Sequence, residues 1–133
     1  TKKGEELMQW LVKSIQDKVD VPLALDTKNT SAIEAGLEVH KGTAMINSVT
    51  GDKEKLDILM PMAKKHKSKI VGIALTEKGV PPDVDSRVEI VMNIVNSALE
   101  HDVPLGDLYL DPIAMPVAVL QRQVSNCIKP VQK

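Results

Sequence analysis

The fold of this chain is decided by residues 21–46, which read VPLALDTKNTSAIEAGLEVHKGTAMI. Residues 21–25 form a short apolar run, which predicts a buried strand ending at Asp26. A helical pattern follows and stops near Gly42, and residues 44–46 predict a second strand. Two buried strands joined by one helix indicate a βαβ unit with parallel strands.

The same alternation continues on both sides of this unit. The further predicted elements are a helix over residues 4–19, a helix capped by Asp52, a strand over residues 70–75, a helix starting at Asp85 or Ser86, a strand over residues 108–110 and a last helix opened by Pro116.

Two of these helices carry specific expectations. The first has apolar residues at every fourth position, and its inward stripe should consist of Leu7, Leu11, Ile15 and Val19. The helix after Asp52 contains Pro61, which lacks a backbone N–H and should kink or split the helix.

The resulting order, αβαβαβαβα, predicts an α/β fold with a parallel sheet. The strands are uniformly apolar, so both faces of the sheet should be covered. An open doubly wound sheet and a (β/α)8 barrel both fit this order. A complete barrel needs roughly 200 residues or more. At 133 residues, with a helix first, the chain would supply only a middle section of one, about four βα units forming a single partial domain.

Composition excludes several function classes. The net charge of -1 provides no basic surface for nucleic acid, and Trp10 and Tyr109 are too few for a base-stacking platform. No apolar run is long enough to span a membrane. A single cysteine, Cys127, forms no internal disulfide and favours a reducing, cytoplasmic location.

Polar residues stand at the ends of three predicted strands: Asp26, Asn47 and Asp111. Parallel strands end on one rim, where active sites of such folds gather. Each residue taken alone could instead cap a helix or form a turn. Together, two carboxylates and a carboxamide suit a heterocycle edge that presents an amino group, a ring N–H and a carbonyl. A metal could also accept these groups.

No histidine supports a metal site. The three histidines, His40, His66 and His101, fall near predicted helix C-termini, where an imidazolium complements the helix dipole, and we expect them at the surface.

Five motifs occur in an order that resembles the methyltetrahydrofolate:corrinoid methyltransferases, pterin-binding relatives of dihydropteroate synthase and of the folate domain of methionine synthase. The motifs are Leu25-Asp26-Thr27, Ala32-Ile33-Glu34-Ala35-Gly36-Leu37, Met45-Ile46-Asn47-Ser48, Glu77-Lys78-Gly79-Val80-Pro81 and Tyr109-Leu110-Asp111-Pro112.

The resemblance implies a pterin-binding (β/α)8 TIM barrel, of which this chain holds the third to sixth strands, approximately from the second helix to the sixth. It implies that Asp26, Asn47 and Asp111 hold the pterin ring. Apart from the resemblance, Ser48 and Thr50 are expected either to add hydrogen bonds to the ligand or to satisfy the loop that follows the strand. The implied reaction moves the N5-methyl group of methyltetrahydrofolate to Co(I) of a corrinoid (cobalamin) on a partner protein. The intact enzyme would be a homodimer, and the Asn that meets N5 would lie on a seventh strand outside this chain.

Alternative functions remain open at this point. A dihydropteroate synthase-like enzyme shares the Asp, Asn and Asp positions, but its Asp-Pro precedes a loop with Gly and Phe, whereas residues 113–117 contain neither. A non-catalytic half-barrel fragment is a second alternative, and this chain alone should be inactive with half of the pocket missing. A flavodoxin-like domain is disfavoured because no Gly-rich phosphate loop follows residues 21–25.

Overall fold

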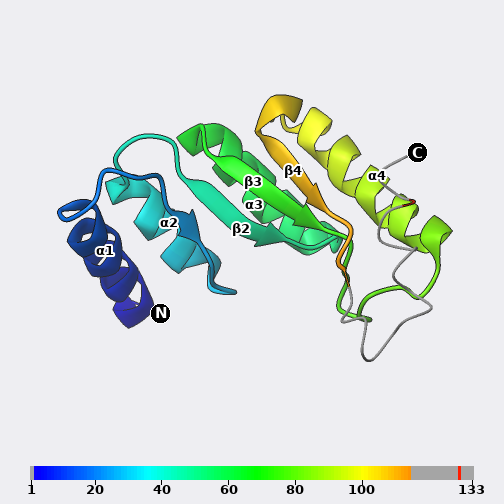
Figure 1. Cartoon of the computed structure of the whole chain (residues 1–133), viewed down its shortest axis with the longest axis horizontal. Coiled ribbons are helices and arrows are strands. Elements are labelled where there is room, and N and C mark those ends of the chain that lie inside the picture. Colours follow the sequence, from blue (N-terminus) through cyan, green and yellow to red (C-terminus); the bar gives the residue numbers. More distant parts are fainter. Residues whose placement is uncertain (1, 115–128, 130–133) are drawn as a thin grey trace.

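The computed structural model describes residues 2–114 and residue 129 of the chain. Its elements are α1 (Lys2–Gln16), β1 (Ala24–Leu25), α2 (Thr30–Val39), β2 (Met45–Val49), α3 (Lys53–His66), β3 (Lys69–Ile73), α4 (Val84–Glu100), the short 3-10 helix η1 (Leu105–Asp107) and β4 (Leu108–Asp111) (Figure 1). The helix predicted from Pro116 lies outside the described residues.

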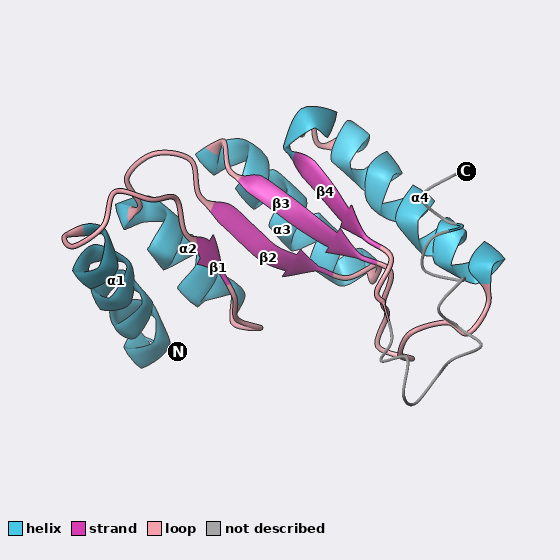
Figure 2. Cartoon of the chain, in the orientation of Figure 1, coloured by secondary structure: helices cyan, strands magenta, loops and turns pink. Residues whose placement is uncertain are grey.

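The four strands form one parallel sheet in the order β1-β2-β3-β4. Sequential order means that every strand pairs with its neighbour in the chain, as in a barrel. Figure 2 shows α2, α3 and α4 on the same side of this sheet. A doubly wound sheet would carry helices on both faces. The α/β prediction is therefore confirmed, and the arrangement is that of a partial (β/α) barrel.

Side-chain burial agrees with a one-sided helical layer. Along β2 and β3, Ile46 and Ile70 are fully buried towards the helices, whereas Met45, Lys69 and Val71 are only partly buried. The prediction that both faces are covered is wrong within the described residues. Uniformly apolar strands here reflect a barrel segment, whose second face would meet the other strands of a barrel across its interior.

The core lies between the sheet and its helices. Leu25, Ile46 and Ile70 from the strands pack in one buried cluster with helical residues such as Ile33 and Ile94. Gly72 of β3 lets α4 approach closely, because a Cβ there would lie 2.7 Å from Cγ2 of Ile94. Such a distance is below van der Waals contact, so the helix-sheet spacing depends on this glycine.

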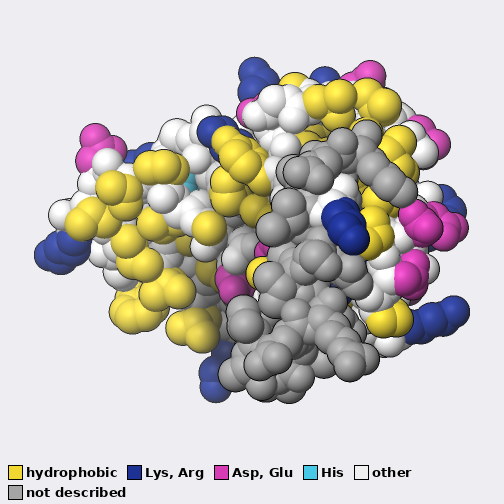
Figure 3. Space-filling view, turned by 45° about the vertical axis from the view of Figure 1, so that its right-hand side comes forward, with side chains coloured by type: hydrophobic (Ala, Val, Ile, Leu, Met, Phe, Trp, Pro, Cys, Tyr) yellow, Lys and Arg dark blue, Asp and Glu magenta, His cyan; other side chains and the backbone are white. Residues whose placement is uncertain are grey.

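The first helix buries a different face from the predicted one. Val12 is buried and Met8 packs against the core, whereas Leu7 is 59% exposed and Leu11, Ile15 and Val19 are also exposed. Met8 lies against Gly36 of α2, at 2.8 Å from the position of a Cβ. The predicted stripe was wrong because α1 packs beside α2 at the end of the sheet, so only a narrow face is covered. Figure 3 shows hydrophobic side chains gathered at this left-hand end.

Two further helix predictions differ from the structure in part or in whole. The α3 helix runs without interruption through Pro61, so of the two predicted effects, a kink or a split, the split is wrong. The α4 helix is capped by Asp83 rather than Asp85 or Ser86, because the Asp83 Oδ1 accepts the backbone N–H of Ser86 at 2.8 Å.

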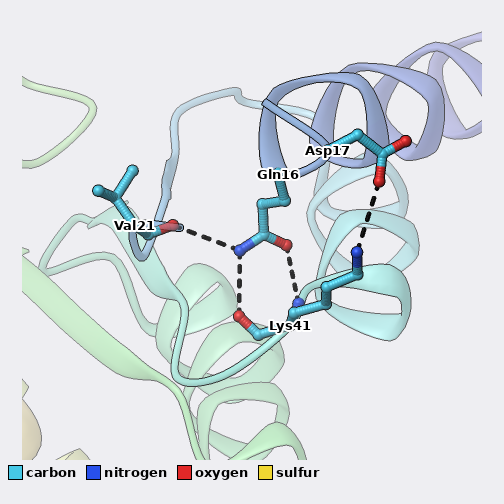
Figure 4. Close-up of polar contacts among 4 residues, drawn as sticks. All are labelled: Gln16, Asp17, Val21 and Lys41. Carbon is cyan, nitrogen blue, oxygen red and sulfur yellow. Dashed lines mark hydrogen bonds and ion pairs between the residues drawn. The ribbon is translucent and has the colours of Figure 1, made fainter. Parts of the chain in front are cut away.

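Gln16, the last residue of α1, ties this helix to the turn after α2 (Figure 4). Its Oε1 accepts the backbone N–H of Lys41 at 2.8 Å, and its Nε2 donates to the Lys41 carbonyl at 3.0 Å. The same Nε2 donates to the Val21 carbonyl at 3.3 Å. One amide side chain thus hydrogen-bonds backbone groups of two segments, the one before β1 and the one after α2.

Candidate functional site

Asp26 follows β1 directly and is not used to cap the next helix. Asn29 is the N-cap of α2, and its Oδ1 accepts the backbone N–H of Ala32 at 3.3 Å. Thr27 supports this turn by accepting the Asn29 N–H at 3.2 Å. The Asp26 carboxylate is exposed on the rim and is left available for a ligand.

Asn47 and Ser48 lie within β2, one strand further along the sheet. Asn47 pairs with Val71 and Val49 pairs with Gly72, so Ser48 is an extra residue and the strand bulges there. Successive strand residues normally point to opposite faces. A bulge changes this, because it redirects one side chain. Both Asn47 and Ser48 consequently line the same pocket.

This pocket has a volume of about 540 Å³ and lies at the carboxyl ends of β1, β2 and β3. Its size suits a small-molecule ligand. The lining residues are Asp26, Thr27, Lys28, Thr30, Ile33, Asn47, Ser48, Thr50, Asp52, Lys55, Leu59, Ile73, Leu75, Thr76, Glu77 and Gly79. Three of the four predicted site residues, Asp26, Asn47 and Ser48, are therefore brought together.

One wall of the pocket comes from the loop after β3, which contributes Thr76, Glu77 and Gly79. Asp52 holds this loop, since its two carboxylate oxygens accept the Glu77 backbone N–H at 3.2 and 3.1 Å. Asp52 is the N-cap residue of α3, as predicted, but its side chain makes no capping hydrogen bond. It also accepts the Thr50 hydroxyl at 2.7 Å, which completes a polar corner of the pocket.

Asp111 lies on the same rim but outside this pocket. It is the last residue of β4 and pairs with Ile73, which lines the pocket. Paired residues of parallel strands share a face, so Asp111 faces the same side of the sheet as Ile73. Its Oδ1 accepts the Ile113 backbone N–H at 2.8 Å. The carboxylate thus supports a local turn, and its exposure leaves it open to a ligand on the rim.

Charges of both signs surround the pocket: Lys28 and Lys55 stand with Asp26, Asp52 and Glu77. The two lysines were not predicted from the sequence as lining residues. Lysines in exposed turns and helices carry no distinguishing pattern, and only the fold shows which ones face the pocket.

The opposite end of the open sheet face holds another polar pair. The Lys69 ammonium donates to the Tyr109 hydroxyl at 3.1 Å, and this hydrogen bond raises the pKa of Lys69. The ammonium also lies 5.4 Å from the centre of the tyrosine ring. This pair is at the amino ends of the strands, far from the pocket rim.

The histidines occupy helix C-termini, as predicted, but they are not free surface groups. His40 accepts the Leu23 backbone N–H on Nε2 at 3.0 Å, and the His66 side chain is largely buried. Among residues 2–114, no three His, Cys, Asp or Glu side chains are grouped so that they could hold a metal ion. In that same part of the chain, no helix is long and apolar enough to cross a membrane.

Comparison with known proteins identifies the family. The family model described as "Pterin binding enzyme" matches residues 3–132, nearly the whole chain. The chain therefore belongs to the pterin-binding enzyme family, which confirms the resemblance found in the sequence.

The similar proteins include one named as a methyltransferase and two named as methionine synthases. The chain is 25% identical to the methylcorrinoid:tetrahydrofolate methyltransferase of Eubacterium limosum over 123 residues, covering 91% of this chain and 45% of the relative. It is 24% identical to the methionine synthase of Mycobacterium tuberculosis over 122 residues, covering 87% of this chain and 10% of that protein. The methionine synthase of Mycobacterium leprae is also 24% identical, over 77% of this chain and 9% of its own length. The chain thus spans less than half the length of each of these relatives.

Proposed function

We propose that this chain forms part of an enzyme that transfers the methyl group between N5 of methyltetrahydrofolate and the cobalt of a corrinoid protein. The observation that carries the proposal is the convergence of Asp26, Asn47 and Ser48 in one pocket at the strand ends of a pterin-binding barrel segment. Methyltetrahydrofolate is the proposed methyl donor, and Co(I) of a corrinoid held by a partner protein is the proposed acceptor.

Hydrogen bonding explains why these residues suit a pterin. A carboxylate is an acceptor only, so Asp26 can accept from the amino group and the ring N–H of the pterin edge. The Asn47 carboxamide both donates and accepts, so it can pair with the neighbouring ring atoms. Asp111, on the same rim, is the proposed second carboxylate, and Ser48 adds a hydroxyl beside Asn47.

In the proposed reaction the protein has two tasks: to stabilise positive charge at N5 and to position the methyl group relative to the cobalt. An amine anion is a poor leaving group, so N5 must gain positive character by protonation or a strong hydrogen bond in the transition state. Co(I) is already a strong nucleophile, and the enzyme has only to align it with the methyl group. The group that meets N5 is proposed to lie outside residues 1–133, so that these residues alone bind the pterin without completing the reaction.

The direction of transfer is not a property of the pocket. The name of the Eubacterium limosum relative describes transfer from a methylcorrinoid to tetrahydrofolate. The same contacts would stabilise one transition state in either direction, by microscopic reversibility. The relatives named above also favour methyl transfer over a dihydropteroate synthase-like reaction, since none of the three names describes the latter.

We also propose the partner, the location and the oligomeric state of the intact enzyme. The partner is a corrinoid protein, the location is cytoplasmic, the intact enzyme is a homodimer, and these residues form a middle section of the barrel. Two observations support a section of a barrel: the chain covers 45% of the Eubacterium limosum relative, and its helices α2, α3 and α4 lie on one side of the sheet.

The test is calorimetric titration of methyltetrahydrofolate into the intact protein and into its Asn47→Ala variant. We expect the wild type to bind and Asn47→Ala to bind roughly 1–3 kcal/mol more weakly, because a buried ring edge loses its partner. The matched control is Asn96→Ala, which removes the same side chain from an exposed position on α4 and should bind normally. A folded wild type that binds no folate would rule out the proposal.

A further inference from the structure

Arg87 is the largest fully buried side chain among the described residues, and it is not part of the pocket lining. It lies in the first turn of α4, close to the rim of the sheet. Burying a guanidinium is costly unless the group is fully hydrogen-bonded. The hydrogen-bond partners of the Arg87 guanidinium therefore indicate its role.

Arg87 joins two loops that leave neighbouring strands. Its Nε donates to the Pro81 carbonyl at 2.8 Å, in the loop after β3 that also walls the pocket. Its Nη1 donates to the Pro112 carbonyl at 3.0 Å and to the Ile113 carbonyl at 2.9 Å, in the loop after β4. The planar guanidinium holds these donors in fixed directions, which a lysine ammonium cannot reproduce.

The second loop is the turn that contains Asp111. Ile113 has a φ of 59°, a left-handed conformation that is costly for a β-branched residue. Two contacts hold it there: the Asp111 carboxylate accepts its N–H, and Arg87 donates to its carbonyl. The Asp111 carboxylate is hydrogen-bonded to this turn, so the conformation of the turn sets the position of the carboxylate on the rim.

We propose that Arg87 is a positioning residue of the pterin site, which fixes the Asp111 turn against the pocket wall formed by the loop after β3. Asp52 anchors the near end of that wall through Glu77, and Arg87 anchors its far end through Pro81. Asp111 thereby keeps a set distance from the pocket that holds Asp26 and Asn47, although it does not line that pocket itself. This inference rests on the proposed function, because Asp111 is assigned there to the pterin edge.

The test is a double-mutant cycle on the affinity of the intact protein for methyltetrahydrofolate, using Arg87→Lys and Asp111→Asn. Arg87→Lys keeps the charge and loses the fixed donors, and we expect its Kd to rise about tenfold. If Arg87 acts through Asp111, the double variant binds no more weakly than Asp111→Asn alone. Effects that multiply, or a folded Arg87→Lys with wild-type Kd, would overturn the proposal.

A purely structural role predicts a different pattern. It would lower the midpoint of thermal unfolding of Arg87→Lys and leave the Kd of the folded protein unchanged. The matched control is Lys64→Met, since the Lys64 ammonium also ties a helix to a loop carbonyl, that of Asp102 at 2.8 Å, but at the other end of the sheet. We expect this control to bind folate normally.

Amide hydrogen exchange on the wild type tests the proposal without any variant. Bound methyltetrahydrofolate should slow exchange in residues 76–80 and at Ile113 together, because Arg87 joins the two loops. Slowing confined to the first loop would overturn the inference. Failure of the wild type to bind folate would instead remove the proposed function, so the two failures are distinguishable.

Discussion

Asn47 and Ser48 show how a single residue's environment is set by the backbone. The bulge in β2 lets neighbouring side chains enter one pocket, where regular pleating would send one of them into the helical layer. Asp26 gains its freedom from Asn29, which takes over the capping of α2. Asp111 differs, because its carboxylate also supports a local turn by accepting the Ile113 N–H.

The two carboxylates give the first residue-scale prediction. Asp26→Asn and Asp111→Asn should each weaken methyltetrahydrofolate binding to the intact protein by about 1–3 kcal/mol, because an amide presents one acceptor fewer to the pterin N–H groups. Asp111→Asn keeps an oxygen that can accept the Ile113 N–H, so the local turn is preserved. Titration calorimetry measures the change.

The control for these variants is Asp57→Asn on the exposed face of α3. It makes the same chemical change and removes only a surface ion pair with Lys53, 3.2 Å apart in the native protein. Affinity losses as large in the control would mean that net charge, rather than contact with the pterin, governs binding.

At the scale of elements, glycines on β3 and on the loop after β2 allow α4 to approach the sheet closely. A Cβ at Gly72 would lie 2.7 Å from Ile94 Cγ2, and one at Gly51 would lie 2.4 Å from Ile90 Cγ2. Both neighbours are β-branched residues of α4, whose rotamers are restricted. The position of α4 relative to β3, and with it the position of Arg87, depends on these two close approaches.

We therefore expect Gly72→Ala to lower the free energy of unfolding by about 1–3 kcal/mol, because the added methyl group overpacks the interface. Urea denaturation followed by circular dichroism measures the change. Gly106→Ala is the matched control, since a Cβ there would meet nothing within 4 Å and its backbone is not left-handed. Equal stabilities for the two variants would contradict the packing argument.

At the scale of the whole molecule, the described residues leave both ends of the sheet without a neighbouring strand. Strands β1 and β4 are the edges. On α1, which packs beside α2, Trp10 is 62% exposed, and Leu7 and Leu11 are also exposed. Open edges and exposed apolar side chains favour association with other chains.

We predict that a preparation of residues 1–133 alone self-associates at concentrations on the order of 100 μM, as unpaired edges and apolar patches commonly do. Sedimentation velocity measures this. Trp10→Lys should shift the distribution towards the monomer, whereas Gln9→Lys, on the same helix and partly buried, changes charge equally and should shift it less. A monomeric wild type would show that the exposed face is tolerated by a stable half barrel.

The sequence by itself determined the alternation of strands and helices, the parallel sheet and the family. Short apolar runs, capping residues and ordered motifs are local signals, and local chemistry is sufficient to produce them. It also pointed to Asp26, Asn47 and Asp111, because strand ends share a rim in any parallel sheet.

Only the tertiary structure decided which faces are buried and how the rim is assembled. In the structure Val12 is buried and Leu7 is exposed. The buried face of α1 is the one that packs against α2, and the apolar periodicity of α1 alone does not predict it. The tertiary structure also placed Asp111 outside the pocket of Asp26 and Asn47, and it revealed Arg87 as the buried link between two loops. Such relations join residues distant in sequence, and they depend on packing geometry that no local pattern encodes.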